Sequence, residues 1–135
     1  MATKPIIYLT YTDAVVEHIE LMRRLEEVHY GVFDRALLES ALARPRQAAA
    51  YDNASLPAQA ATLAFGLIKN HPWAGGNKRT ATHLTDQFLK RNGLEIGATT
   101  AEIVEMVVAV ESDKWDVARL TEWMRQHVIH FSRPK

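Results

Sequence analysis

The sequence contains no cysteine among its 135 residues. This absence excludes a disulfide framework, a thiolate metal site and a cysteine nucleophile. Long hydrophobic runs are also missing: no stretch approaches the ~20 apolar residues that a membrane-spanning helix needs, and the start of the chain shows no signal peptide. We therefore expect a cytoplasmic protein without a membrane partner.

The chain has no excess of either charge, because 16 Lys and Arg residues stand against 16 Asp and Glu residues. A protein that binds nucleic acid irrespective of sequence normally has a strong basic excess, so we expect no direct nucleic-acid partner. Hydrophobic residues make up 47% of the chain, which is enough for one core, and the length is too short for two ordinary domains. The expectation is a single domain over residues 1–135.

Helical patterns separated by short turns predict an all-α fold, a compact bundle of about six helices. The apolar run at residues 6–9 is too short to distinguish a short N-terminal strand from an extended lead-in. Thr12 or Asp13 is expected to cap the first helix, and the second, capped by Asp34, is expected to end before Pro45. Later helices are expected from Pro57 through Ile68, from Lys78 to Arg91, after a Thr99–Glu102 capping box, and from Trp115 to Val128.

The segment from His71 to Thr80 reads His-Pro-Trp-Ala-Gly-Gly-Asn-Lys-Arg-Thr and carries the most chemical information. Gly75 and Gly76 permit the positive φ angles and close backbone approach of an anion-binding turn. This turn leads into a helix N-terminus, where free backbone N–H groups and the positive end of the helix dipole favour an anion. The pattern predicts a phosphate site.

Three charged or titratable side chains flank the same turn. Lys78 and Arg79 add positive charge, and His71 is of the residue type that accepts a proton from a hydroxyl near neutral pH. Cations in a first helical turn oppose the helix dipole, which suggests that an anion normally offsets them. The alternative is an ordinary Gly-Gly turn between two helices with both cations in solvent. The spacing matches neither a P-loop nor a Rossmann fingerprint.

Residues 71–79 resemble the signature loop of the Fic/Doc (Fido) superfamily, H-x-F-x-[DE]-[GA]-N-[GK]-R. The chain resembles the death-on-curing (Doc) branch in having a lysine, Lys78, at the variable position. Thr82 stands where many adenylylating Fic proteins have a second arginine, which also favours the Doc branch. The resemblance covers nearly the whole chain and implies a Fido-type helical fold. Further similar segments are Tyr8–Thr10, His29–Gly31, Leu37–Pro45, Phe65–Asn70 and Phe88–Gly93.

The Doc resemblance implies the toxin of a type II toxin–antitoxin system. Such a toxin uses ATP and Mg²⁺ to transfer a phosphoryl group to a threonine of translation elongation factor Tu, and adenylylation is the nearest variant of that chemistry. The implied catalytic residues are His71 as general base, Asn77, Lys78 and Arg79. The implied nucleotide-binding residues are Gly75, Gly76, Asn77, Lys78 and Arg79, with the N–H groups of residues 75–77 and the Asn77 side chain as anion hole.

The resemblance also implies how the protein is regulated. In the family, the region corresponding to Pro45–Ser55 forms a flap that helps to align the target peptide. The inhibitory-helix pattern of many Fic proteins, S/T-x-x-x-E-G/N, is absent from this sequence. We therefore expect inhibition by a second chain, a small Phd-like antitoxin that folds onto the toxin near its active site.

Two residues depart from the family pattern. Trp73 replaces the usual Phe, and its indole N–H needs a partner if the ring is buried. Gly75 occupies the acidic position whose carboxylate helps to hold Mg²⁺ in the family, so no metal ligand of this chain is certain. An impaired protein that binds only nucleotide or antitoxin is therefore the main alternative. A structural domain with an incidental turn is the third.

The remaining histidines are expected to have structural roles. His83 should be packed or hydrogen-bonded, and His18 and His29 should lie in the first helix or at its end. His127 and His130 should form a solvated pair rather than a metal site, because a third ligand is missing.

Overall fold

The computed structural model describes residues 4–131, which form six helices and two short strands. The expected bundle of about six helices is confirmed. None of the helices within this range is long and apolar enough to cross a membrane. The helices are α1 (Tyr11–Arg24), α2 (Arg35–Asp52), α3 (Leu56–Asn70), α4 (Asn77–Arg91), α5 (Thr100–Glu111) and α6 (Val117–His127).

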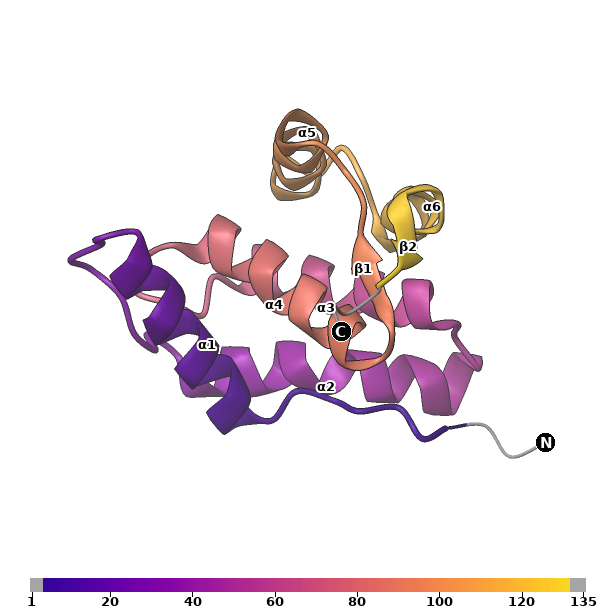
Figure 1. The fold of residues 1–135 in the computed structure, drawn as a ribbon, viewed down its shortest axis with the longest axis horizontal. Coiled ribbons are helices and arrows are strands. Elements are labelled where there is room, and N and C mark those ends of the chain that lie inside the picture. The colour runs from indigo at the N-terminus through magenta and orange to yellow at the C-terminus, as the bar shows by residue number, and fades with distance from the viewer. Residues whose placement is uncertain (1–3, 132–135) are drawn as a thin grey trace.

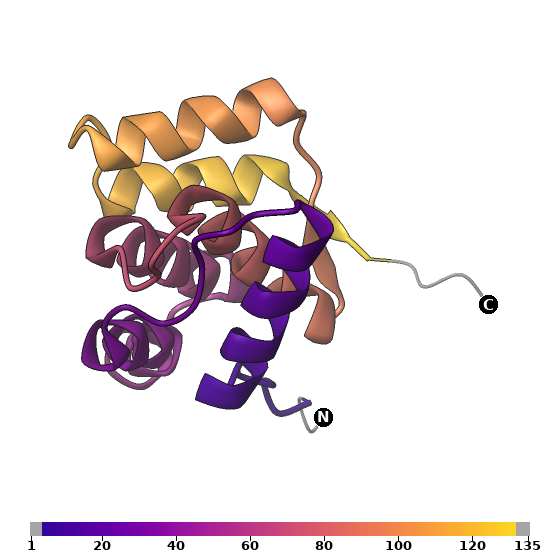
Figure 2. The same ribbon diagram turned by 90° about the vertical axis from the view of Figure 1, so that its left-hand side faces the viewer.

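Helix α3 lies in the middle of the molecule (Figure 1). It packs against α2 on one side and against α4, α5 and α6 on its other sides. In the second view α5 and α6 form a pair above α3 and α4, α2 lies on the opposite side, and α1 crosses in front of them (Figure 2). This arrangement fixes the turn between α3 and α4 relative to both α1 and α5.

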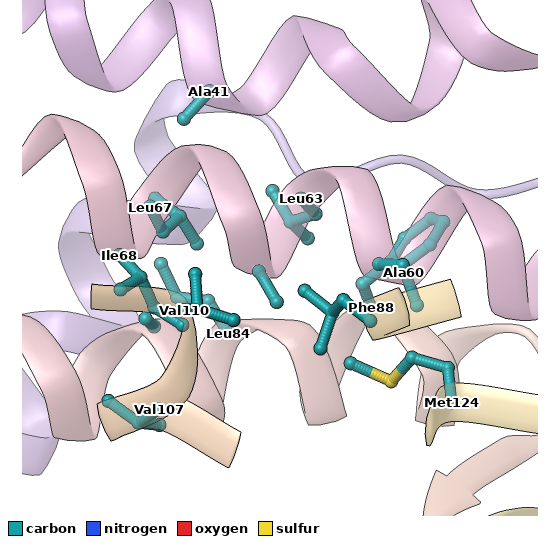
Figure 3. Close-up of a cluster of buried hydrophobic side chains, with 14 of the residues drawn as sticks. Ala41, Ala60, Leu63, Leu67, Ile68, Leu84, Phe88, Val107, Val110 and Met124 are labelled. Atoms are coloured by element: carbon teal, nitrogen blue, oxygen red, sulfur yellow. The ribbon is translucent and has the colours of Figure 1, made fainter. Parts of the chain in front are cut away.

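The hydrophobic core is centred on α3 (Figure 3). Small residues of α3, such as Ala60 and Ala64, allow neighbouring helices to approach closely, and its larger residues fill the space between them. Burying one large aliphatic or aromatic side chain stabilises a fold by about 1.5–3 kcal/mol. Labelled members of the cluster are Ala41, Ala60, Leu63, Leu67, Ile68, Leu84, Phe88, Val107, Val110 and Met124.

Most helices of the described chain begin with a side-chain cap. The capping residues are Thr10, Asp34, Ser55, Thr99 and Asp116. The expected cap of α1 at Thr12 or Asp13 is wrong. Thr10 caps this helix, and Asp13 returns the bond as the third residue of a capping box, which is why the acid lies inside the helix.

Helix α2 continues through Pro45 to Asp52, so the predicted end before Pro45 is wrong. A proline inside a helix costs about 3 kcal/mol, because a backbone bond is lost and the ring crowds the preceding turn. Close packing on α3 offsets this cost: Pro45 is buried, and a Cβ at Gly66 would lie only 3.2 Å from the Cβ of Ala41. The region expected as a flap, Pro45–Ser55, is therefore helical as far as Asp52.

No strand forms at residues 6–9, where the chain is an irregular lead-in. The side chain of Asn92 accepts the N–H of Ile7 at 2.8 Å and donates to its carbonyl at 2.9 Å. The expected stop of α4 at Asn92-Gly93 is confirmed, with Gly93 at a φ of 85°.

A small two-stranded antiparallel sheet joins the segment after α4 to the segment after α6, and the sequence patterns did not predict it. Strands β1 (Leu94–Ile96) and β2 (Val128–His130) pair antiparallel, with Glu95 opposite Ile129. The last helix is shorter than expected, since Trp115 precedes α6 and Val128 opens β2. Runs of three residues are too short for a period-2 pattern to stand out.

Candidate phosphate site at the start of helix α4

The turn between α3 and α4 has the backbone geometry that a phosphate site requires. His71 ends α3 in the left-handed conformation with a φ of 47°, and Gly76 precedes α4 with a φ of 70°. No side chain of the described residues caps α4. Within residues 4–131, the N–H groups of Gly75, Gly76 and Asn77 donate to no acceptor. The turn thus presents free donors at the positive end of a helix dipole.

Asn77 holds the turn closed through its side chain. Its Oδ1 accepts the N–H of Trp73 at 3.0 Å, and its Nδ2 donates to the carbonyl of Trp73 at 2.9 Å. The N–H of Ala74 donates to the carbonyl of Gly31, and Trp73 forms a bridge with Val32. An incoming phosphate would therefore meet the backbone N–H of Asn77 and only the remaining amide hydrogen of its side chain.

His18 supports the turn from α1, and the sequence did not reveal this role. Its side chain is fully buried and stacks on Trp73, with ring centroids 3.9 Å apart. Nε2 accepts the N–H of Gly31 at 3.0 Å, so the proton is on Nδ1, which donates to the hydroxyl of Thr80 at 2.8 Å. Burial lowers the pKa of His18 to about 4, so the ring is neutral at physiological pH.

Trp73 fills the aromatic position with one polar group left over. Its side chain is buried, and its indole Nε1 has no hydrogen-bond partner in the part of the chain that the structure describes. A phenylalanine has no polar group in its side chain and would avoid the cost of about 1–3 kcal/mol that an unpaired buried donor carries. The stack on His18 is the contact that this ring makes in return.

Position 75 has no room for a side chain. A Cβ on Gly75 would lie 2.2 Å from the backbone carbonyl oxygen of His29, which is closer than real Cβ atoms approach. An acidic residue here would require the chain at His29 to move. No group of three or more potential His, Asp or Glu ligands occurs within residues 4–131. The loop itself therefore supplies no carboxylate for the Mg²⁺ that the resemblance implies, an ion that proteins usually hold through one or two carboxylates beside the phosphate oxygens.

A carboxylate from α5 faces the loop side chains. Oε1 of Glu111 lies 3.1 Å from Nζ of Lys78, and Oε2 lies 3.6 Å from Nε2 of His71. Lys69 holds the same end of α5, because it pairs with Asp113 and lies 3.5 Å from the carbonyl oxygen of Glu111. One weak signal for this role is visible in the sequence: an acid in a last helical turn opposes the helix dipole and needs a partner.

A groove of about 560 Å³ opens beside the site, between α4 and α5. Lys78 and Arg79 lie in its lining, and Leu21 of α1 contributes to another wall. Val104 and Val108 of α5 also line it and are about half exposed, at 55% and 50%. Arg79 forms no ion pair with any residue of the described range, so its charge is available to a ligand.

The other histidines lie away from the turn or are paired. His83 contacts Glu17 at 2.7 Å, as expected for a hydrogen-bonded residue. His29 is exposed after the end of α1. His127 and His130 do not form the expected solvated pair: His127 stacks on Trp123 and contacts the carboxylate of Glu102 at 3.0 Å, whereas His130 is exposed in β2.

The sequence of this chain is similar to those of known proteins. The family model described as "Fic/DOC family" matches residues 8–89, a segment that includes the turn and more than half of the chain. Toxin Doc of Mycolicibacterium smegmatis (strain ATCC 700084 / mc(2)155) is 41% identical over 70 residues, which are 50% of this chain and 53% of that protein. The chain thus spans about half the length of the curated relative that it matches. This chain belongs to the Fic/DOC family.

Proposed function

We propose that this protein is a Doc-type toxin of a type II toxin–antitoxin system that transfers a phosphoryl group from ATP to a threonine hydroxyl of elongation factor Tu. The observation that carries the proposal is the uncapped start of α4, with free N–H donors between His71 and the cations Lys78 and Arg79. The similarity to Toxin Doc supports the choice of branch. Because the proposed target is a translation factor, we place the protein in the cytoplasm.

In this reaction the threonine oxygen forms a bond to the γ-phosphorus, and the bond from that phosphorus to the β–γ bridging oxygen breaks, which releases ADP. His71, half exposed at the end of α3, accepts the hydroxyl proton. The N–H groups of residues 75–77 bind oxygens of the transferring group, and Lys78 and Arg79 offset their charge. Donors that are already oriented contribute strongly, since removing one such donor typically lowers kcat by about 10²–10³.

A binding-only protein is the second candidate, and Gly75 favours it. Gly75 supplies no carboxylate at the family's acidic position, and the carbonyl of His29 occupies the space where a side chain would begin. Such a protein would retain the free N–H donors, which do not depend on a metal, and would bind nucleotide without transfer.

The intact mass of elongation factor Tu after incubation with this protein, ATP and Mg²⁺ separates these candidates. A gain of one phosphoryl group is the expected result, whereas a gain of one adenylyl group would move the protein to the adenylyltransferases. No gain, together with ATP binding by calorimetry, would establish the binding-only protein.

The matched control in this assay is His71→Ala, an exposed substitution outside the core. It should abolish transfer and leave ATP binding nearly unchanged. Transfer at the wild-type rate in this variant would contradict the assignment of His71 as the base.

For the antitoxin we propose the groove between α4 and α5 as the docking site of an amphipathic helix. Val104 and Val108 offer an unpartnered apolar strip, and Lys78 and Arg79 at the same groove favour acidic residues in the partner. A bound helix would thereby lie next to the phosphate site and obstruct it.

Substitution of the apolar strip tests this docking site. In cells that also express a Phd-like antitoxin, Val108→Asp should retain toxicity and lose neutralisation. The control is Val16→Asp on α1, which is similarly exposed at 47% and does not line the groove. Full neutralisation of the Val108→Asp protein would contradict the proposed site.

A further inference from the structure

Glu111 and Lys78 each lie where their own helix opposes their charge. Lys78 is in the first turn of α4, beside the positive end of that helix dipole, and Glu111 is the last residue of α5, beside a negative end. Their side chains meet at 3.1 Å and are partly exposed. The ion pair therefore offsets the unfavourable interaction of each charge with the dipole of its own helix.

The position of Glu111 is fixed by further contacts at the same end of α5. Lys69, in the last turn of α3, pairs with Asp113 and reaches the carbonyl oxygen of Glu111. The second oxygen of the Glu111 carboxylate faces Nε2 of His71 at 3.6 Å. The carboxylate thus lies between the proposed base and a proposed phosphate-binding cation.

A phosphate that binds at the start of α4 must compete with this carboxylate for Lys78. The two anions carry like charge, so the approach of a phosphate oxygen to Lys78 is less favourable while Glu111 remains bound to it. Gly75 supplies no charge of its own, and Glu111 is the acid that the structure brings to both Lys78 and His71.

We propose that Glu111 is the internal counter-ion of the phosphate site and is displaced from Lys78 when the phosphates of a nucleotide bind. Glu111 therefore sets the affinity of the site for phosphates. This inference rests on the proposed function, because it takes the start of α4 to be the place where nucleotide phosphates bind.

Calorimetric titration of ATP and of pyrophosphate into the wild-type protein and the Glu111→Gln variant tests the proposal, with and without Mg²⁺. Because such a partly exposed ion pair contributes up to ~1 kcal/mol, the variant should bind both ligands about three- to fivefold more tightly. The control is Glu105→Gln, which removes the same charge from an exposed position of α5. Glu105→Gln should bind as the wild type does.

A double-mutant cycle adds a second test. In the background Lys78→Met, the substitution Glu111→Gln should change pyrophosphate affinity by less than about twofold, because the cation for which the anions compete is gone. An unchanged gain in that background would contradict competition for Lys78.

Two other outcomes would overturn the proposal. Equal affinity of the wild type and Glu111→Gln would show that the carboxylate does not compete with phosphates. Binding of the phosphate ligands that is weaker in Glu111→Gln only when Mg²⁺ is present would make Glu111 a metal ligand instead.

The same titrations separate this proposal from the proposed function. Tighter pyrophosphate binding by Glu111→Gln, with ATP bound no better than pyrophosphate and elongation factor Tu unmodified, would support the counter-ion and contradict the nucleotide-dependent toxin. No binding of either ligand by any variant would contradict both.

Discussion

The backbone N–H groups in the first turns of helices α5 and α4 are treated differently. At α5 the hydroxyl of Thr99 accepts the N–H of Glu102 at 3.1 Å, and the carboxylate of Glu102 accepts the N–H of Thr99 at 2.9 Å. At α4 the preceding residue is Gly76, which has no side chain to offer, and the next two residues after Asn77 are cations. One start is closed by its own residues, and the other is open to an anion.

The open start is held in place by distant parts of the chain. His18 reaches Thr80 across 62 residues, and the N–H of Ala74 bonds the carbonyl of Gly31. These contacts leave the first N–H groups of α4 free while they fix the backbone around them. A binding site can therefore use the positions that a cap would otherwise fill, provided that tertiary contacts supply the missing rigidity.

Acidification should protonate His18, which supports the open start of α4, and should have the largest effect on the free energy of unfolding. Because the pKa of His18 is lowered to about 4, the unfolded chain binds this proton first as the pH falls through 6.5. The free energy of unfolding should therefore decrease between pH 6.5 and about 4, by roughly 3 kcal/mol from this residue. Urea unfolding of the wild type and His18→Gln across this range measures the effect, and parallel curves would contradict it.

A methyl group at position 75 should disturb the open start next most strongly. The Cβ of Gly75→Ala meets the carbonyl of His29, and overpacking of this kind costs about 1–3 kcal/mol. Denaturant unfolding should show this loss, and ATP affinity should fall with it. The control is Gly93→Ala, whose Cβ meets no atom within 4 Å although its φ is positive; it should leave ATP affinity unchanged.

Removal of the cap should affect the closed start alone. Thr99→Ala deletes the hydroxyl that accepts the N–H of Glu102, which typically costs about 1 kcal/mol. Thermal or denaturant unfolding should show this loss, while calorimetry should show unchanged ATP binding. A fall in ATP affinity as large as that of Gly75→Ala would mean that the two helix starts are not independent.

Neutralising a cation at the open start should stabilise the protein slightly and weaken its function. Arg79→Gln removes a charge that opposes the helix dipole, so the free energy of unfolding should rise by about 0.3–0.5 kcal/mol. ATP affinity should fall in the same variant. Lower stability of Arg79→Gln would indicate that Arg79 has a structural partner.

The closed start of α5 could be predicted from the sequence. At the open start of α4 only the loop residues could be predicted, and the residues that reach it from other helices could not. The Thr99–Glu102 pair lies within four residues, so its capping box is visible as a local pattern. The glycines and cations of residues 75–79 are equally local and predicted an anion site. By contrast, the buried histidine at position 18 and the acid at position 111 reach the site only through the packing of α1 and α5.

Local rules miss two features of the fold for the same reason. A local rule predicts that α2 ends before Pro45, and the packing of α2 on α3 overrides it. The sequence shows only that Gly75 occupies the family's acidic position, whereas the structure shows that the carbonyl of His29 leaves no room for a Cβ there. Both features depend on residues far away in sequence.

The most direct test of the open start is a titration of ¹⁵N-labelled protein with ATP, followed by amide NMR. We expect saturable shifts of the amide resonances of Gly75, Gly76 and Asn77, with little change at Thr100 and Ala101 at the closed start of α5. Shifts at both helix starts alike, or at neither, would contradict the claim that α4 begins in a phosphate site.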